Sequence, residues 1–267
     1  MASEAFKPIA IRAPGDNRLL FAVRCVVDLQ LLTTYAYLRE QLPRLRGSVL
    51  DVGAGESPWR ELLADAEYTG LDVESANNFG MRRRPEMVYY DGGRMPFADG
   101  SFSHVMTSEV LEHVPDPKAF MAEVARVIAP GGSLVLTVPW SARLHHLPHD
   151  FHRFTRFALA ALVESNGLQV QHIVERGNDV AVVANKLIVM TIRLLRPQRM
   201  VNVIWSWPLA LVMGPLSVGF LAAAHLAMRL DLGSRDDPLG YGLLAVKKPG
   251  EPAAKDPCSL ATASFAT

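Results

Sequence analysis

The sequence predicts an α/β protein built on a mostly parallel sheet, with helices on both faces and an apolar helical insertion before the last strand. Three observations support this fold class. Short apolar runs alternate with helix-like stretches between residues 47 and 177, which is typical of a parallel sheet. A glycine-rich turn directly follows the first apolar run. A strongly apolar stretch then separates this region from a final strand-like run, residues 240–249.

The chain divides into five segments by composition. Residues 16–42 have a helical pattern, although charged side chains interrupt the apolar positions. We therefore expect an N-terminal helical segment, the alternating core, the apolar insertion, the last core strand and a disordered, proline-containing tail. Their expected bounds are 1–46, 47–177, 178–239, 240–249 and 250–267.

The turn after the first strand is the most informative local feature. A short apolar run, residues 49–52, precedes Gly53 and Gly55, which allow the backbone to turn tightly and to approach a ligand closely. Ser57 is expected to cap a following helix, and Pro58 suits the first turn of that helix. The pattern therefore predicts a strand, a ligand-binding turn and a helix in succession.

An acid at the end of the next strand-like run indicates which ligand this turn binds. Asp72 follows Asp51 by 21 residues, and a glycine turn followed about 20 residues later by an acid is the layout that holds a nucleoside ribose. A dinucleotide site requires a third glycine, where this chain has Pro58. Asp51, just before the turn, would repel a pyrophosphate but suits the cationic methionyl end of S-adenosylmethionine. A methyl donor is thus favoured over a dinucleotide, and over a turn without a ligand.

Further motifs follow this turn in order. Residues 91–106 lead into Ser-Glu-Val-Leu-Glu-His-Val at 108–114, and residues 120–139 contain a helical pattern, Ala-Pro-Gly-Gly and a strand. Together they resemble the class I S-adenosylmethionine-dependent methyltransferases, in particular the broad group typified by ubiquinone/menaquinone-biosynthesis methyltransferases. The resemblance covers roughly residues 45–178 and is specific for cofactor and fold, but weakly specific for the acceptor. It implies a Rossmann-like, seven-stranded, mostly parallel sheet and S-adenosyl-L-methionine as cofactor.

The resemblance also implies which residues hold the cofactor. Asp72 would take the ribose hydroxyls, and Val73 would pack on the adenine. Asp91 and Gly92 match positions that read the adenine edge, although Asp91 has a simpler alternative role as a turn former. Ser108 and Glu109 would lie near the methionyl part. The full set of expected cofactor-binding residues is Asp51, Gly53, Ala54, Gly55, Asp72, Val73, Asp91, Gly92, Ser108 and Glu109.

The loop after the fifth strand, residues 140–155, is the richest source of candidate catalytic groups, with four histidines, one aspartate and two arginines close together. We expect His149 to act as a base or to orient the acceptor, with the adjacent Asp150 fixing its tautomer. In the alternative, these two residues and Arg153 pin the loop to the following helix. His113 is a further catalytic candidate, which either contacts the acceptor or packs at the start of a turn.

No metal ion is expected. A site formed by His145, His149 and His152 is conceivable from composition, but no cysteine or paired glutamate supports it. The formal net charge is zero, and the one basic run, residues 82–84, is short enough to be a solvated loop, so no nucleic-acid partner is expected. Two cysteines and an N-terminus unlike a signal peptide indicate a cytoplasmic protein.

The apolar insertion is the least conventional part of the chain. Residues 200–228 contain no Asp, Glu, Lys or Arg, which is long enough to span a bilayer, although Pro208 and Pro215 are expected to break the run into pieces. In the implied fold the last two strands form an antiparallel hairpin, so both ends of the insertion lie at the carboxyl edge of the sheet. We favour a bent hairpin or a helical cap in the membrane interface; a buried lid and a transmembrane hairpin are the alternatives.

These features lead to three functional hypotheses. The first is an O-methyltransferase for an apolar, lipid-linked or glycan-type acceptor, in peripheral contact with the inner face of the cytoplasmic membrane through residues 178–239. The His-Asp-aromatic-x-Arg-aromatic-Thr pattern supports it, because it resembles loops in group members that act on glycans or lipid-linked compounds. The second is a soluble methyltransferase of a polyketide-like small molecule with a hydrophobic lid. The third is a non-catalytic cofactor-binding scaffold, against which the intact donor motif argues.

Overall fold

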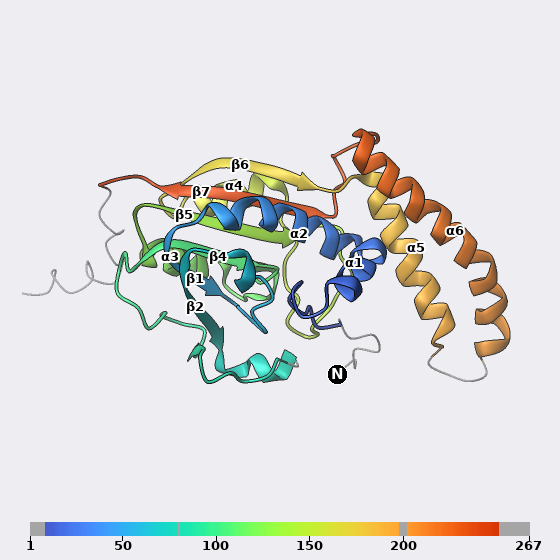
Figure 1. The fold of residues 1–267 in the computed structure, drawn as a ribbon, viewed down its shortest axis with the longest axis horizontal. Coiled ribbons are helices and arrows are strands. Elements are labelled where there is room, and N and C mark those ends of the chain that lie inside the picture. Colours follow the sequence, from blue (N-terminus) through green and yellow to red (C-terminus); the bar gives the residue numbers. More distant parts are fainter. Residues whose placement is uncertain (1–8, 80, 198–201, 251–267) are drawn as a thin grey trace, which may run out of the picture.

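The computed structural model describes residues 9–79, 81–197 and 202–250, so most of the predicted tail lies outside the described residues. Its centre is one seven-stranded sheet in the order β3-β2-β1-β4-β5-β7-β6, which confirms the predicted sheet (Figure 1). Strand β7 runs antiparallel to both of its neighbours, β5 and β6, whereas the other paired strands are parallel. The strands are β1 Gly47–Val52, β2 Ala66–Val73, β3 Val88–Tyr90, β4 Phe102–Ser108, β5 Ile128–Pro139, β6 Leu168–Arg176 and β7 Gly240–Lys247.

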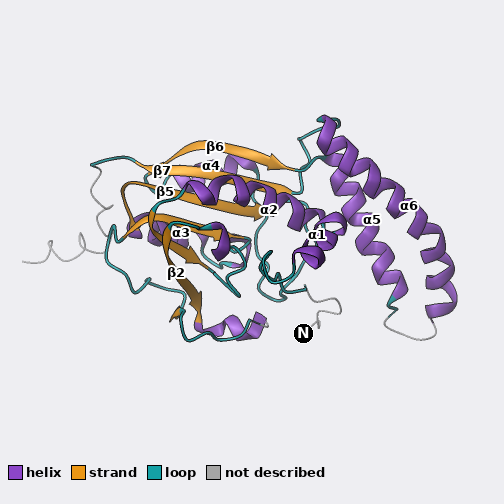
Figure 2. Cartoon of the chain, viewed as in Figure 1, coloured by secondary structure: helices purple, strands orange, loops and turns teal. Residues whose placement is uncertain are grey.

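Helices cover both faces of the sheet, as predicted. Figure 2 shows α2 in front of the sheet and α3 and α4 behind it. The α-helices are α1 Arg18–Val27, α2 Leu29–Gln41, α3 Pro117–Val127, α4 Arg156–Glu164, α5 Asp179–Leu195 and α6 Val203–Leu230. Four short 3-10 turns are η1 Leu42–Arg44, η2 Arg60–Leu62, η3 Glu74–Phe79 and η4 Leu111–His113.

The strand register produces the two halves of the core. Leu50 pairs with Val105 and Val105 with Leu134, so that these fully buried side chains form one row facing α3 and α4. The next row contains Met106 and Val135, which face α2 instead. Successive residues of a strand point to opposite faces, so alternate positions of these continuously apolar strands supply both layers.

Of two local predictions near the start of the core, the helix after the glycine turn was wrong, whereas the N-terminal helical segment is present. No α-helix follows the glycine turn; Ser57 has a backbone φ of 53°, whereas a helix N-cap has an extended backbone, and its hydroxyl instead accepts a hydrogen bond from Tyr68. The helical pattern over residues 16–42 is two helices that bend by 119°. Asp28 explains the break, because it ends α1 and its carboxylate caps α2 at the Leu31 amide.

The apolar insertion forms a helical hairpin of α5 and α6 that extends beyond the sheet (Figure 1). It leaves the sheet after Arg176 and returns at Gly240, and these two residues are paired across β6 and β7. Because β6 is parallel to the other strands, its end lies at their carboxyl edge. The predicted position of the insertion is therefore confirmed.

Helix α6 is continuous over 28 residues, so the prediction that Pro208 and Pro215 break it was wrong. Each proline removes a single helical N–H donor, and both lie on the exposed side of the helix, away from α5. The opposite side carries a seam of small buried residues, Ala210, Ser217 and Ala224, spaced seven apart. This seam lets the two helices approach closely, and Thr191 on α5 shares a 2.8 Å hydrogen bond with Ser217 across it.

Candidate active site

The expected site residues lie on loops that meet at the carboxyl edge of the sheet. The glycine turn follows β1, Asp72 lies near the end of β2, and Asp91 follows β3. Glu109 and the histidine-rich loop follow β4 and β5. Because these strands are parallel and adjacent, the topology gathers five separate stretches of sequence into one region.

The glycine turn packs closely against β2 and the loop after β4. Gly53 has a φ of 74°, and its amide donates to the Leu71 carbonyl over 2.8 Å. A Cβ at Gly53 would lie 2.4 Å from a methyl group of Val110 in the loop after β4. The position therefore requires glycine both for its backbone conformation and for the close approach of two ligand-facing loops.

Asp72 already organises this turn. Its Oδ2 accepts a 2.9 Å hydrogen bond from the Gly55 amide, and its Oδ1 accepts one of 2.8 Å from the Val73 amide. The carboxyl group is largely buried, and this burial raises its pKa above the ordinary value. The acid and the glycine turn thus form one unit, as the 21-residue spacing indicates.

A segment after β2 covers the region beside Asp72. The cavity here measures about 50 Å³, well below the ~300–1,000 Å³ of ligand pockets, and its lining includes Asp72, Met81 and Tyr89. Arg84 fastens this segment by donating to the Glu56 carbonyl over 2.8 Å, and the guanidinium of Arg83 lies 4.6 Å from the centre of the Tyr89 ring. The covering segment therefore leaves only a small cavity beside Asp72.

Asp51 lies beneath the turn. Its carboxyl group is buried and accepts a 2.9 Å hydrogen bond from the Tyr68 hydroxyl. Burial raises the pKa of Asp51 to about 7, although the Tyr68 hydrogen bond acts in the opposite direction. The sequence did not indicate Tyr68 as a partner, because its hydroxyl reaches Asp51 only through the pairing of β1 with β2.

The loop after β3 is more open. Asp91 is exposed, and its Oδ1 accepts a 2.8 Å hydrogen bond from the Gly93 amide, which is the geometry of a turn-forming aspartate. Gly92 has a φ of 91°, and a Cβ there would lie 3.6 Å from Val73. The loop therefore places Gly92 beside the residue expected to pack on adenine.

The loop after β4 is held by neighbouring strands. The Ser108 hydroxyl lies 2.9 Å from that of Thr137 on β5, and the Glu109 amide donates to the Thr137 carbonyl. Glu109 Oε1 accepts a 2.7 Å hydrogen bond from the buried guanidinium of Arg176. Arg176 is a site-region residue that the sequence analysis missed, since nothing in the local pattern of β6 distinguishes it.

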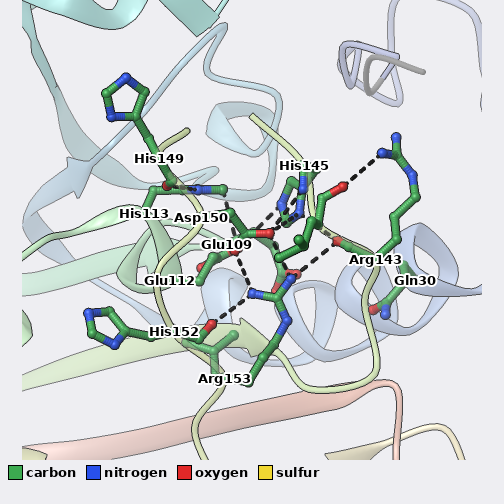
Figure 3. A network of polar contacts seen from close by, with 12 residues as sticks. Gln30, Glu109, Glu112, His113, Arg143, His145, His149, Asp150, His152 and Arg153 are labelled. Carbon is green, nitrogen blue, oxygen red and sulfur yellow. Dashed lines mark hydrogen bonds and ion pairs between the residues drawn. The ribbon is translucent and has the colours of Figure 1, made fainter. Parts of the chain in front are cut away.

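The next turn, η4, brings a buried carboxyl group against two imidazoles (Figure 3). Glu112 is fully buried, and neither side-chain oxygen has a hydrogen-bond partner within residues 9–79, 81–197 and 202–250. Its Oε1 lies 3.6 Å from His113 Nε2 and 3.8 Å from His145 Nε2. Burial, and then the neighbouring Glu109, raise the pKa of Glu112 well above its ordinary value, whereas burial lowers the pKa of His113 to about 4.

The histidine-rich loop orients both imidazoles. His113 Nδ1 lies 2.7 Å from the carbonyl oxygen of His149, and His145 Nδ1 lies 3.1 Å from Asp150 Oδ2. Arg153 pairs with the same Asp150 carboxylate, which is the bracing interaction considered for this loop. The histidine beside Asp150 is therefore His145 and not the expected His149.

Backbone conformation explains this difference. His146 has a φ of 52°, and the turn closes with a 2.9 Å hydrogen bond from the His149 amide to the His146 carbonyl. This folds the chain back, so that the His145 amide donates to Asp150, while the His149 ring points away from the cluster (Figure 3). Among the described residues, the group able to hold a metal ion is Glu112, His113 and His145, and His149 and His152 are not part of it.

Comparisons with known proteins point to methyltransferases. Residues 50–136 match a family model described as "Methyltransferase domain". A demethylmenaquinone methyltransferase of Renibacterium salmoninarum is 43% identical over 96 residues, which are 33% of this chain and 39% of that protein. The chain thus spans about two fifths of the length of such relatives.

Two further relatives align over longer stretches. A ubiquinone biosynthesis O-methyltransferase of Xanthomonas oryzae pv. oryzae is 30% identical over 51% of this chain and 69% of its own length. A fatty-acid O-methyltransferase of Mycolicibacterium smegmatis is 33% identical over 48% of this chain and 54% of its own length. Among solved structures, a chain from the complex of the Haloferax volcanii Trm112 methyltransferase activator with a methyltransferase has a TM-score of 0.50 at 17% identity. It covers 92% of this chain and 100% of its own, and it shows the shared fold.

Proposed function

The chain belongs to the class I S-adenosylmethionine-dependent methyltransferases, and from this premise we propose that it methylates an oxygen of an apolar, lipid-linked or glycan-type acceptor at a membrane surface. S-adenosylmethionine is the cofactor of this family, and when bound it supplies an electrophilic methyl group. Methyl transfer has a good leaving group, so the protein contributes chiefly by holding donor and acceptor in line. The relatives named for quinone and fatty-acid acceptors support an apolar acceptor.

The donor site that we infer follows the order of the strands. The turn at Gly53, Ala54 and Gly55 would hold the donor, with Asp51 buried beneath it. Asp72 and Val73 would contact ribose and adenine. The loops after β3 and β4 would contact the adenine end and the methionyl end of the donor. These last residues are Asp91 and Gly92 on the adenine side, and Ser108 and Glu109 on the methionyl side.

The acceptor would be deprotonated at the cluster of Glu112, His113 and His145. An alcohol is a poor nucleophile until its proton is lost, so O-methylation needs a group that promotes this step. Asp150 orients one imidazole through its carboxylate, and the main chain of His149 orients the other. We assign the His149 side chain, which points away from the cluster, to orienting the acceptor.

The surface of α6 carries the membrane part of the proposal. This helix is long and apolar enough to cross a membrane, but only 17% of its most apolar window is buried. Its small residues face α5, whereas its large residues face outward: Trp205 is 80% exposed and Leu211 is 78% exposed. A water-soluble hairpin has the opposite pattern, because burying one large apolar side chain contributes about 1.5–3 kcal/mol.

Neighbouring features favour an interfacial position over a crossing. Helix α1 also exposes large apolar side chains, Leu19 and Leu20, and its other end lies against α6, where His225 Nε2 lies 2.8 Å from the Val26 carbonyl. Arg193 and Trp205 lie near the tip of the hairpin, a combination typical of membrane interfaces. A buried lid would require a cover over these side chains that the described residues do not supply.

Vesicle flotation with anionic lipids tests the proposal. Full-length protein should float, whereas a variant with residues 178–239 replaced by a short linker should not. Leu211→Lys should weaken flotation, and Phe157→Lys is the matched control, because Phe157 is equally exposed but lies on α4, outside the hairpin. Labelled S-adenosylmethionine with a fractionated lipid extract then identifies the acceptor. Full-length protein that stays monodisperse without detergent and never floats would contradict the membrane assignment.

A further inference from the structure

We propose that Glu112, His113 and His145 form a binding site for a divalent transition-metal ion, with Zn²⁺ as the best match. One carboxylate oxygen and two imidazole nitrogens lie within 4.8 Å of one another. The two ligand pairs that share Glu112 Oε1 are separated by 3.6 Å and 3.8 Å. With metal–ligand bonds of about 2.0–2.2 Å, ligand atoms of a tetrahedral site lie roughly 3.3–3.6 Å apart, so small side-chain rotations complete the geometry.

Both imidazoles are oriented as metal ligands. His113 places Nδ1 on the His149 carbonyl, which accepts a hydrogen bond and so requires the proton to be on Nδ1. His145 places Nδ1 near the Asp150 carboxylate and the Arg143 carbonyl, both acceptors. In each ring the unprotonated nitrogen is therefore Nε2, which lies 3.6 Å (His113) or 3.8 Å (His145) from Glu112 Oε1. A carboxylate or carbonyl behind a histidine is the usual outer support of a metal-bound imidazole.

Within the described residues, the buried carboxyl group has two imidazoles as neighbours but no hydrogen-bond partner. Glu112 is fully buried, and both its oxygens lack a hydrogen bond within the described residues. A buried polar group without a hydrogen bond destabilises the folded state. Carboxyl groups buried in this way are paired or coordinate a metal ion.

The ligand set indicates the class of metal and its use. Two imidazoles and one carboxylate suit Zn²⁺ or a related transition metal, whereas Mg²⁺ and Ca²⁺ prefer oxygen ligands. Three protein ligands leave a coordination position open, which distinguishes a catalytic site from a closed structural one. The side chains of His113 and His145 are 15% and 18% exposed, so an acceptor would reach the open position from their exposed side.

The role of the ion rests on the proposed function. An acceptor hydroxyl coordinated at the open position loses its proton to water more readily, because the ion stabilises the oxygen anion. That oxygen then forms a bond to the methyl carbon, the carbon–sulfur bond of the donor breaks, and its electron pair remains on sulfur. The ion itself undergoes no redox change.

Metal titration tests the site without any methylation assay. Chelator-treated, full-length protein is titrated with Co²⁺ by visible absorption and with Zn²⁺ by calorimetry. We expect one ion per chain, and a loss of affinity of about 100-fold or more in Glu112→Gln and His145→Ala. Asp150→Asn should weaken binding by about 10- to 100-fold, because it removes only the support of His145. His152→Asn, in the same loop, is the control and should bind normally.

The outcomes separate the site from the function. Absence of stoichiometric binding overturns the proposal, as does unchanged binding in a Glu112→Gln variant whose donor binding and circular dichroism are normal. If the ion binds as expected but no acceptor is methylated, the site stands and the proposed function fails. If methylation persists in protein freed of metal, the function stands and the role of the ion fails.

Discussion

The guanidinium of Arg176 donates a 2.7 Å hydrogen bond to Glu109 Oε1, and so joins the last residue of β6 to the loop after β4. The same side chain also donates to the carbonyls of Tyr241 and Val138 and to the hydroxyl of Thr34. It is 1% exposed. Because the hairpin of α5 and α6 begins just after Arg176, this one side chain links the base of the hairpin to the proposed donor site.

The first prediction concerns this buried arginine. Arg176→Met should lower the free energy of unfolding by about 3 kcal/mol, because it leaves Glu109 and two carbonyls without their donor. Arg156→Met is the control, since Arg156 pairs with Glu175 over 2.6 Å at a more exposed position and should cost about 1 kcal/mol or less. Urea unfolding measures both. If both variants lose the same free energy of unfolding, burial does not determine how much the ion pair of Arg176 contributes to stability.

The second prediction concerns the glycine turn. Gly53→Ala should reduce the affinity for S-adenosylmethionine at least tenfold, because its φ is positive and the new Cβ would meet Val110. Gly131→Ala is the control: its φ is also positive, but no atom lies within 4 Å of its Cβ position. Calorimetry with S-adenosylmethionine and with NAD makes the comparison. Micromolar donor binding is expected for the wild type, and binding of NAD instead would contradict the cofactor assignment.

The third prediction concerns pH and Asp51. Its folded-state pKa of about 7 exceeds the ordinary value of 3.8, so the folded protein binds more protons than the unfolded protein between those pH values. Stability should therefore fall as pH rises from about 4 to about 7. Asp51→Asn removes this term, so its stability relative to the wild type should increase over the same range by up to about 4 kcal/mol.

Urea unfolding at several pH values measures this difference. Tyr68→Phe gives an independent check, because the Tyr68 hydrogen bond lowers the pKa of Asp51. Removing this hydrogen bond should raise the pKa of Asp51, so that the free energy of unfolding continues to decrease up to a higher pH. A constant difference between Asp51→Asn and the wild type from pH 4 to pH 8 would show that the Asp51 pKa is near its unfolded value.

The fourth prediction concerns the histidine-rich loop. His149→Ala and Asp150→Asn should both lower turnover more than they lower donor affinity. The effect of Asp150→Asn should be the larger, because Asp150 orients His145, whereas His149→Ala keeps the carbonyl that orients His113. Steady-state kinetics with the identified acceptor, beside donor calorimetry, separates these effects. If both variants keep wild-type turnover, the loop has only a structural role.

Local spacing made the contact between the glycine turn and Asp72 predictable. The turn at Gly53 follows β1, and Asp72 lies near the end of β2. These two strands are consecutive in sequence and paired in the sheet, so their ends lie side by side. The contact between Arg176 and Glu109 spans 67 residues and depends on how β6 joins the sheet through β7. No local pattern encodes such a pairing.

The acceptor side depended on conformations that composition does not reveal. His149 was expected to pair with Asp150 because the two are adjacent in sequence, yet the left-handed backbone of His146 returns His145 to that carboxylate. The effect of Pro208 and Pro215 likewise depended on the side of the helix on which they lie. On the exposed side of α6 they cost hydrogen bonds without ending the helix.

The paired ends of the hairpin, Arg176 and Gly240, have a consequence for how an acceptor reaches the protein. The hairpin begins and ends beside the candidate site. An enzyme attached to lipid through α6 would therefore hold the carboxyl edge of its sheet at a fixed height above the bilayer. Acceptor molecules would then arrive by lateral diffusion in two dimensions. The rate would follow their mole fraction in the membrane, and adding inert lipid would slow the reaction at constant bulk concentration.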